Sequence, residues 1–211
     1  MDFLFDGNGR VTVLLAHGAG APMDTPFMET VASEIASAGF RVARFEFDYM
    51  ARRRTGGAKR PPPRLGILCA EYRDAIRDLA AEGPLIIGGK SMGGRVASLV
   101  ADEFHASRAI LGLFCLGFPF HPQGKPETLR TAHLEHLETP TLICQGTRDP
   151  FGSRDEVAVY PLSDRIEIFW LEDGDHDLKP RRHLVGASQA QYLRDAAEKL
   201  AGWTERLILP A

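Results

Sequence analysis

The amino-acid sequence predicts a single α/β domain over residues 1–211, built from three layers in which helices cover both faces of a mostly parallel β-sheet. Two observations lead to this fold class. Short apolar runs, typical of strands covered on both faces, alternate with segments in which apolar residues recur every three or four positions. The chain is also long enough to bury a substantial core in one domain, and it contains no internal repeat and no evident linker.

Six apolar runs are the predicted strands, and most of them lack the polar alternation of a strand with one face in water. They are Val11–Ala16, Arg41–Phe47, Leu85–Gly88, Ala109–Leu116, Thr141–Gln145 and Arg165–Trp170. In a parallel sheet, the loops that leave the carboxyl ends of the strands surround the ligand site. Two irregular stretches, residues 50–64 and 118–138, are such loops, and we expect both to border an active site.

Amphipathic segments between and after these runs are the predicted helices. The first begins with Thr25 as a helix cap and Pro26 in the first helical position, a favourable pair at a helix start. The apolar faces are Met28, Val31 and Ile35; Leu68, Tyr72, Ala75 and Leu79; Val96, Leu99 and Val100; and Leu193, Ala196, Leu200, Trp203 and Leu207. The repeated order of strand, helix and strand favours a parallel sheet with helices on both faces.

The composition argues against several classes of protein. Lys and Arg number 25 and Asp and Glu 28, for a formal net charge of -3, so we expect no nucleic-acid partner. The longest apolar run, residues 109–120, is shorter than the roughly 20 residues that a membrane helix needs. The first ten residues lack the features of a secretory signal, and an odd number of cysteines favours a reducing compartment. The expected location is therefore cytoplasmic, without a membrane partner.

One short segment carries the pattern of a nucleophile. In PLIIGGKSMGG, Ser91 lies between an apolar strand and an amphipathic helix, with Gly89 and Gly93 two positions on either side. A nucleophile at the apex of a sharp strand-to-helix turn needs glycines at these positions, because larger residues would collide with the neighbouring chain. The sequence therefore predicts Ser91 as a nucleophile.

A serine hydroxyl becomes reactive only when a base removes its proton and an acid orients that base. Asp149 follows the fifth predicted strand and His176 the sixth, which gives the chain order Ser, Asp, His expected for such a sheet. Three further acids compete with Asp149 for its role, and His183 competes with His176. The three acids are Asp173, Asp175 and Asp177.

The reaction also needs two N–H donors for the oxyanion that forms on the substrate. We expect one from Met92, directly after the nucleophile, and the second from Ala19 in the run HGAG that follows the first predicted strand. His17 in the same run is expected to hold its own glycine loop by hydrogen bonding.

No cofactor or metal is expected. The run GGKS resembles the end of a phosphate-binding loop, but Pro84 stands where the first glycine of that motif belongs. No cluster of His and Cys has the spacing of metal ligands.

Residues 50–64 carry six basic residues and no acid. Such a cluster is either a solvated loop or a cationic rim that attracts anionic substrates. In the second interpretation Arg53 and Arg54 are substrate-binding residues. Neutralising both is then expected to lower kcat/KM for an anionic ester more than for a neutral one.

The runs HGAG, GGKSMGG, QGTRDPFG and GDHDL, in this order, resemble the α/β-hydrolases. More narrowly, they resemble a compact group that includes dienelactone-hydrolase-like proteins and the hydrolase-like domain of a eukaryotic non-specific-lethal chromatin-complex subunit. The resemblance spans about residues 10–206 and implies Ser91 as nucleophile, Asp149 as acid and His176 as base. The antiparallel strands that usually begin this fold are expected to be shortened or missing, and residues 118–138 are too few for a large cap.

These observations predict a serine hydrolase that cleaves a small-molecule ester or thioester through an acyl-enzyme. An open site, able to admit bulky or extended esters, follows from the absence of a large cap. The alternative is an interaction module that keeps the fold without useful turnover and uses the basic loop and the C-terminal helix as contact surfaces. The sequence does not predict the acyl-chain preference or the oligomeric state.

Overall fold

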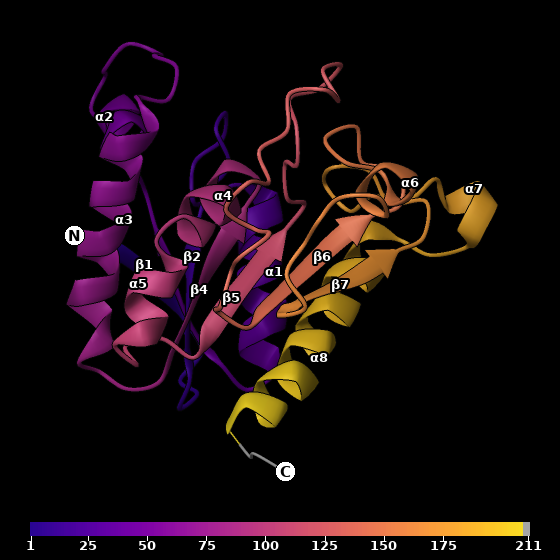
Figure 1. Ribbon diagram of the computed structural model, residues 1–211. Coiled ribbons are helices and arrows are strands. Elements are labelled where there is room, and N and C mark those ends of the chain that lie inside the picture. The colour runs from indigo at the N-terminus through magenta and orange to yellow at the C-terminus, as the bar shows by residue number, and fades with distance from the viewer. Residues whose placement is uncertain (209–211) are drawn as a thin grey trace.

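The computed structural model describes residues 1–208, and its centre is a seven-stranded sheet in the order β1-β3-β2-β4-β5-β6-β7 (Figure 1). The strands are β1 (Phe3–Asp6), β2 (Thr12–Ala16), β3 (Arg41–Phe45), β4 (Leu85–Lys90), β5 (Gly112–Leu116), β6 (Thr141–Gly146) and β7 (Ile166–Leu171). β1 runs antiparallel to β3, and every other neighbouring pair is parallel. The carboxyl ends of six strands therefore meet at one edge.

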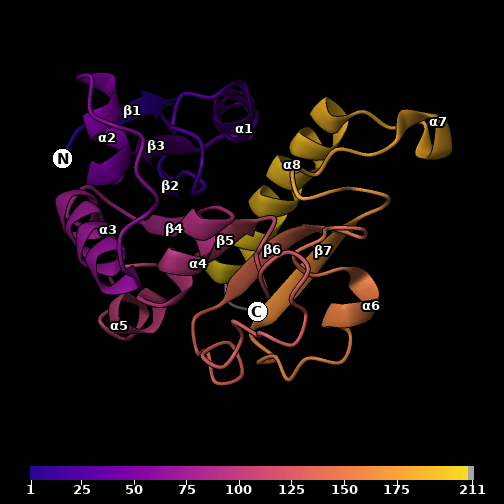
Figure 2. The same ribbon diagram turned by 90° about the horizontal axis from the view of Figure 1, so that it is seen from above.

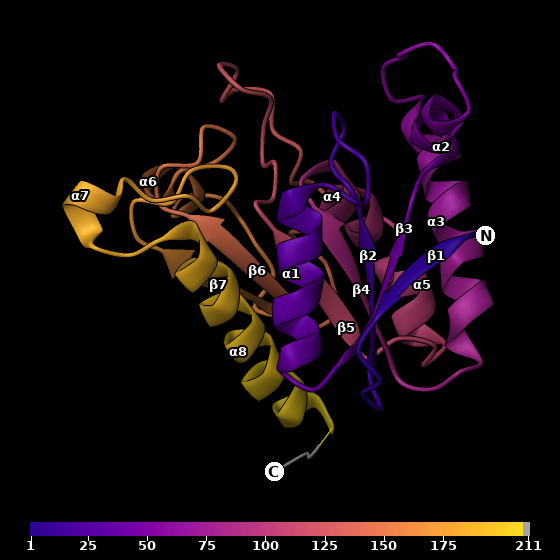
Figure 3. The ribbon, with the colours of Figure 1, turned by 180° about the vertical axis from the view of Figure 1, so that it is seen from behind.

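Helices cover both faces of the sheet, as Figures 2 and 3 show from above and from behind. They are α1 (Pro26–Ser37), α2 (Asp48–Arg54), α3 (Leu65–Ala80), α4 (Met92–Ser98), α5 (Ala101–Ala106), α6 (Arg154–Val157), α7 (Arg182–Val185) and α8 (Gln189–Ile208). α1 and α8 pack on one face around Ile35, Phe114 and Leu200. α3, α4 and α5 pack on the other around Tyr72 and Val96. The predicted three-layer fold class is confirmed.

The first strand was not predicted from the sequence. β1 forms one edge of the sheet, and only one of its sides is paired. Leu4 and Phe5 are exposed there, so the segment lacks the long buried run that reveals the central strands. One antiparallel strand of the N-terminal part of the fold is thus present.

Several predicted boundaries were also wrong. β3 ends at Phe45, because Phe47 leaves the sheet and precedes α2. β5 begins at Gly112 rather than Ala109, and β7 extends to Leu171. The first part of the predicted irregular stretch 50–64, residues 50–54, is helical, because α2 covers residues 48–54. An i,i+4 ion pair of 2.8 Å between Arg52 and Asp48 stabilises this short helix.

The segment between β5 and β6 contains neither a helix nor a strand and forms no large cap. It folds back on the loop after β6, where the N–H of His121 donates to the carbonyl of Phe151 at 3.2 Å. Phe118 and Phe120, near the start of this segment, are fully buried. None of the helices in residues 1–208 has the length and apolar character needed to cross a membrane.

Candidate active site

Ser91 lies at the turn between β4 and α4 in a strained backbone conformation, with φ 52° and ψ -114°. A Cβ on Gly93 would lie 2.7 Å from the carbonyl carbon of Ala16 and 2.8 Å from the carbonyl oxygen of His17. Gly89 has φ +154° and faces the Ala16 backbone equally closely. These contacts require glycine on both sides of the turn, for the reason that the sequence pattern predicted.

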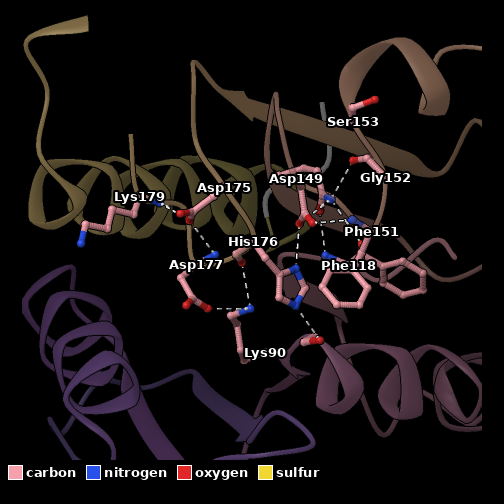
Figure 4. A network of polar contacts seen from close by, with 12 residues as sticks. Lys90, Phe118, Asp149, Phe151, Gly152, Ser153, Asp175, His176, Asp177 and Lys179 are labelled. Atoms are coloured by element: carbon pink, nitrogen blue, oxygen red, sulfur yellow. Dashed lines mark hydrogen bonds and ion pairs between the residues drawn. The ribbon is translucent and has the colours of Figure 1, made fainter. Parts of the chain in front are cut away.

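The structure brings Ser91, Asp149 and His176 into one hydrogen-bonded chain. Nε2 of His176 lies 2.8 Å from Oγ of Ser91, and Nδ1 lies 2.8 Å from Oδ2 of Asp149. Figure 4 shows one side of the imidazole directed at Asp149. Both contacts are satisfied when Nδ1–H donates to the carboxylate and Ser91 O–H donates to Nε2. In this tautomer the imidazole can accept the serine proton.

The carboxylate of Asp149 is fully buried and strongly oriented. Its Oδ1 accepts the N–H of Phe151 at 2.8 Å, and its Oδ2 accepts a second hydrogen bond from Nε2 of Gln145 at 3.0 Å. A buried charge needs such donors because no water is present to solvate it. The carboxylate is therefore fixed before it meets the imidazole.

Gln145 was not predicted from the sequence, and its side chain joins the segment after β5 to the loop after β6. Its Oε1 accepts the N–H of Phe118 at 2.7 Å, and its Nε2 also donates to the carbonyls of Phe118 and Gly152. The side chain is fully buried. A polar residue near the end of the otherwise apolar strand TLICQG was the available signal.

Replacing Gln145 with leucine should lower the stability of the protein. It also removes one of the donors that orient the Asp149 carboxylate. The substitution leaves the buried Phe118 N–H without its acceptor, which costs about 1–3 kcal/mol of unfolding free energy. Urea unfolding measures this loss. Gln191, exposed on α8 and bonded to Asp195, provides the matched control, because Gln191→Leu should change stability by less than about 0.5 kcal/mol. Equal stability of the two variants would contradict the role of Gln145.

The three competing acids have other partners. Asp173 pairs with Arg181 and Arg148, and the hydrogen bonds of Arg181 lower the pKa of Asp173 to about 2. Asp175 accepts the N–H groups of Asp177 and Lys179. His183 is exposed on α7. Of the described candidates, Asp149 alone contacts the His176 imidazole.

Two further residues lie close to His176. The ring of Phe151 lies against it, with centroids 4.2 Å apart. Gly117 has φ +60°, and a Cβ there would lie 2.5 Å from the carbonyl oxygen of His176. Both the backbone conformation and the close approach therefore require glycine at position 117.

The two predicted oxyanion donors lie on segments that border the same site. Met92 is the first residue of α4 and follows Ser91 directly, and in residues 1–208 no hydrogen bond uses its N–H or that of Ala19. The carbonyl of Ala19 accepts the Tyr49 hydroxyl at 2.8 Å. His17 accepts the N–H of Phe47 at Nε2 and contacts the Gly18 carbonyl through Nδ1. Burial lowers the pKa of His17, which keeps this structural histidine neutral.

A cavity of about 400 Å³ opens beside Ser91. Its walls come from the loop after β2, from the start of α1 and from the site itself. The lining residues are Gly18, Ala19, Gly20, Ala21, Thr25, Pro26, Phe27, Met28, Lys90, Ser91, His176 and Asp177. Most of these side chains are small or apolar, and Lys90 and Asp177 are charged. A second hollow lies between α2, the loop of residues 57–63 and α3. Its lining includes none of Ser91, Asp149 and His176.

Arg53 and Arg54 do not line the cavity beside Ser91. Arg54 is held by Glu46 at 2.6 Å and Asp24 at 2.8 Å, and these hydrogen bonds raise its pKa. Arg53 donates to the Arg60 carbonyl at 2.6 Å and lies over the Tyr49 ring. Acids distant in the sequence thus neutralise part of the basic stretch. A substrate-binding role for either arginine stays a prediction.

A second Ser–His contact occurs away from the cavity. Oγ of Ser98 lies 2.8 Å from Nε2 of His133. Ser98 is almost fully buried inside α4, and burial lowers the pKa of His133 to about 4. This pair ties α4 to the segment before β6, whereas Ser91 lines the cavity.

The described residues contain no group of three or more His, Cys, Asp or Glu side chains that could hold a metal. All three cysteines are free and buried. Burial raises the pKa of both Cys115 and Cys144, so these thiols remain protonated.

Comparisons with known proteins agree with this architecture. A family model described as an alpha/beta hydrolase domain matches residues 9–205. An α/β serine hydrolase homologue from Coxiella burnetii is 17% identical, with a TM-score of 0.70 over 94% of this chain and 90% of its own. A serine hydrolase without a lid from Xanthomonas campestris is 19% identical, with a TM-score of 0.68 over 98% and 86%.

A dienelactone hydrolase from Anabaena variabilis is 20% identical, with a TM-score of 0.66 over 94% of this chain and 87% of its own. At these identities the structural likeness is one of fold. The resemblance to the chromatin-complex subunit is not tested by these matches and stays a prediction. Because the family model covers nearly the whole chain, the protein belongs to the alpha/beta hydrolase domain family.

Proposed function

We propose that the protein hydrolyses a small ester or thioester through an acyl-enzyme formed on Ser91. The observation that supports this proposal is the hydrogen-bonded chain from Ser91 through His176 to the buried Asp149, with both contacts at 2.8 Å. Each member has the partner that its role in acyl transfer requires.

In the first half of the reaction, Nε2 of His176 takes the hydroxyl proton while Oγ of Ser91 attacks the carbonyl carbon. The oxyanion that forms is stabilised by the N–H groups of Met92 and Ala19. Asp149 stabilises the charged imidazole and preserves its tautomer. His176 then gives its proton to the departing alcohol or thiol, which leaves an acyl group bonded to Oγ.

Water completes the cycle in the second half. His176 removes a proton from the water as its oxygen attacks the acyl carbon, and the same N–H groups stabilise the second oxyanion. The proton returns to Oγ as the carboxylic acid leaves. The small and apolar cavity walls at Ala19, Ala21, Pro26, Phe27 and Met28 favour a compact acyl or alcohol group beside Ser91.

Labelling with a fluorophosphonate probe tests this proposal, because the probe forms a covalent bond only with an activated serine. We expect labelling of the native chain and none of Ser91→Ala or His176→Ala. Ser98→Ala is the matched control, since it removes the serine of the buried Ser98–His133 pair and should retain labelling. A folded native protein that is neither labelled nor active on p-nitrophenyl esters would instead favour the interaction module.

The predicted anionic preference has its own test at Arg53, whose charge is not paired with a carboxylate in residues 1–208. Arg53→Gln should lower kcat/KM for a carboxylate-bearing ester about two- to threefold more than for its neutral analogue. Arg53 lies over Tyr49, whose hydroxyl contacts Ala19 in the cavity wall, and a cation there raises the local concentration of anions. The difference should shrink at high salt. Equal losses for both esters would remove the steering role.

A further inference from the structure

Lys90 connects the strand that carries Ser91 to the loop that carries His176. Its side chain is only 8% exposed, and Nζ donates to the carbonyl oxygen of His176 at 2.8 Å and pairs with Oδ1 of Asp177 at 3.2 Å. Figure 4 shows the ammonium aimed at these two acceptors beneath the imidazole. The buried Lys90 side chain therefore fixes the position of His176 relative to Ser91, the next residue in the chain.

The ammonium is also close to the imidazole itself. A Cβ on Gly117 would lie 3.2 Å from Nζ of Lys90 and 3.4 Å from Nδ1 of His176, so both nitrogens border the same small space. Charges interact strongly over such separations when little water lies between them. Burial lowers the pKa of Lys90, and the carboxylate of Asp177 opposes this shift.

We propose that Lys90 and Asp177 form an ion pair that positions His176 and sets the pH range in which its imidazole is neutral and able to accept the Ser91 proton. This inference rests on the proposed function. Lys90 and Asp177 are positioning residues, because their contacts reach the reacting hydroxyl only through His176.

The charged groups around the imidazole come from three segments. Lys90 belongs to β4, Asp149 to the loop after β6, and Asp175 and Asp177 to the loop of His176 itself. Arg148 lies 3.5 Å from the Asp175 carboxylate and offsets part of its charge. Lys90 is the cation of this group that contacts the His176 backbone.

The two members of the pair act on the imidazole with opposite sign. A neighbouring positive charge opposes protonation of a histidine, and a negative charge favours it. Lys90→Met should therefore move the acidic limb of the kcat/KM profile to higher pH by about one unit. Asp177→Asn should move the limb to lower pH, and by less, because its carboxylate is 64% exposed and screened by water.

The first measurement is the pH dependence of kcat/KM with p-nitrophenyl acetate for the native chain and both variants, because this profile reports ionisations of the free enzyme. Lys179→Met is the matched control. Lys179 lies in the same loop, and its side chain is exposed and points away from the imidazole in Figure 4. The acidic limb of the Lys179→Met profile should therefore stay within about 0.2 pH unit of the native limb.

The second measurement does not depend on turnover. In a Ser91→Ala background, ¹⁵N NMR of the histidine side chains follows the titration of the His176 imidazole, which is assigned by its loss in a His176→Gln variant. The titration midpoint should rise with Lys90→Met and fall with Asp177→Asn. If the native chain proves inactive, the proposed function fails while this titration still tests the ion pair.

Three results would overturn the inference. One is a loss of activity in both variants with unshifted profiles and unshifted NMR midpoints, which indicates a structural contact alone. Another is a shift of the acidic limb or of the NMR midpoint in the same direction in Lys90→Met and Asp177→Asn. The third is an equal shift in Lys179→Met, which indicates the net charge of the protein rather than this pair. Thermal unfolding of each variant establishes that the compared proteins are folded.

Discussion

Replacing Ser91 with alanine should reduce kcat for a p-nitrophenyl ester by about 10⁶-fold, the size expected when the nucleophile of such a chain is removed. The loss is this large because the imidazole then has no hydroxyl to deprotonate, and the proposed oxyanion donors of Met92 and Ala19 can stabilise only the slow attack of water. Steady-state kinetics with active-site titration measure the effect. A reduction of less than about tenfold would be incompatible with Ser91 as the nucleophile.

The same position has a predictable effect on stability. Ser91 has a positive φ that side chains rarely adopt, and this strain is stored at the turn. Ser91→Gly should be as inactive as Ser91→Ala, yet its unfolding free energy should be about 1 kcal/mol higher than that of the alanine variant, because glycine relaxes the turn. Urea unfolding of the two inactive variants separates the chemical role of the hydroxyl from the conformational strain of the backbone.

Replacing Asp149 with asparagine should lower kcat by about 10⁴-fold. The amide can present its NH₂ group to Nδ1 of His176, which favours the imidazole tautomer that carries its proton on Nε2 and cannot accept one from Ser91. The amide also cannot satisfy its surroundings, because the Phe151 N–H faces one carboxylate oxygen and the Gln145 Nε2 group faces the other. One of these donors must then meet another donor, and stability should fall by about 1–3 kcal/mol.

Asp155 provides the matched control for Asp149. It is the next acid along the chain and is exposed in the first turn of α6. Asp155→Asn should therefore change kcat by less than about twofold and the unfolding free energy by less than about 0.5 kcal/mol. If Asp149→Asn retained near-native kcat while Asp173→Asn lost activity, the acid would have been assigned to the wrong residue.

The sequence alone predicted the layers of the fold and the segments from which the site is built. Buried parallel strands appear in the sequence as mainly apolar runs, such as VLLA around Leu14 and LIC around Ile143, because both faces of each strand need apolar cover. The Ser91 turn was equally visible, since its glycines are required by contacts with the adjacent β2 strand. β1 and α2 were missed because a half-exposed edge strand and a seven-residue helix leave weak periodic patterns.

Only the tertiary structure decided which charged groups meet. Asp149 and Asp173 are similar in sequence context, yet one reaches His176 and the other is paired with Arg181. Lys90 and Gln145 occupy the ends of apolar strands, and their partners come from loops far along the chain. The physical reason is that periodicity reports how each residue is buried within its own element, whereas Coulomb interactions and hydrogen bonds depend on distances between elements, which no local pattern contains.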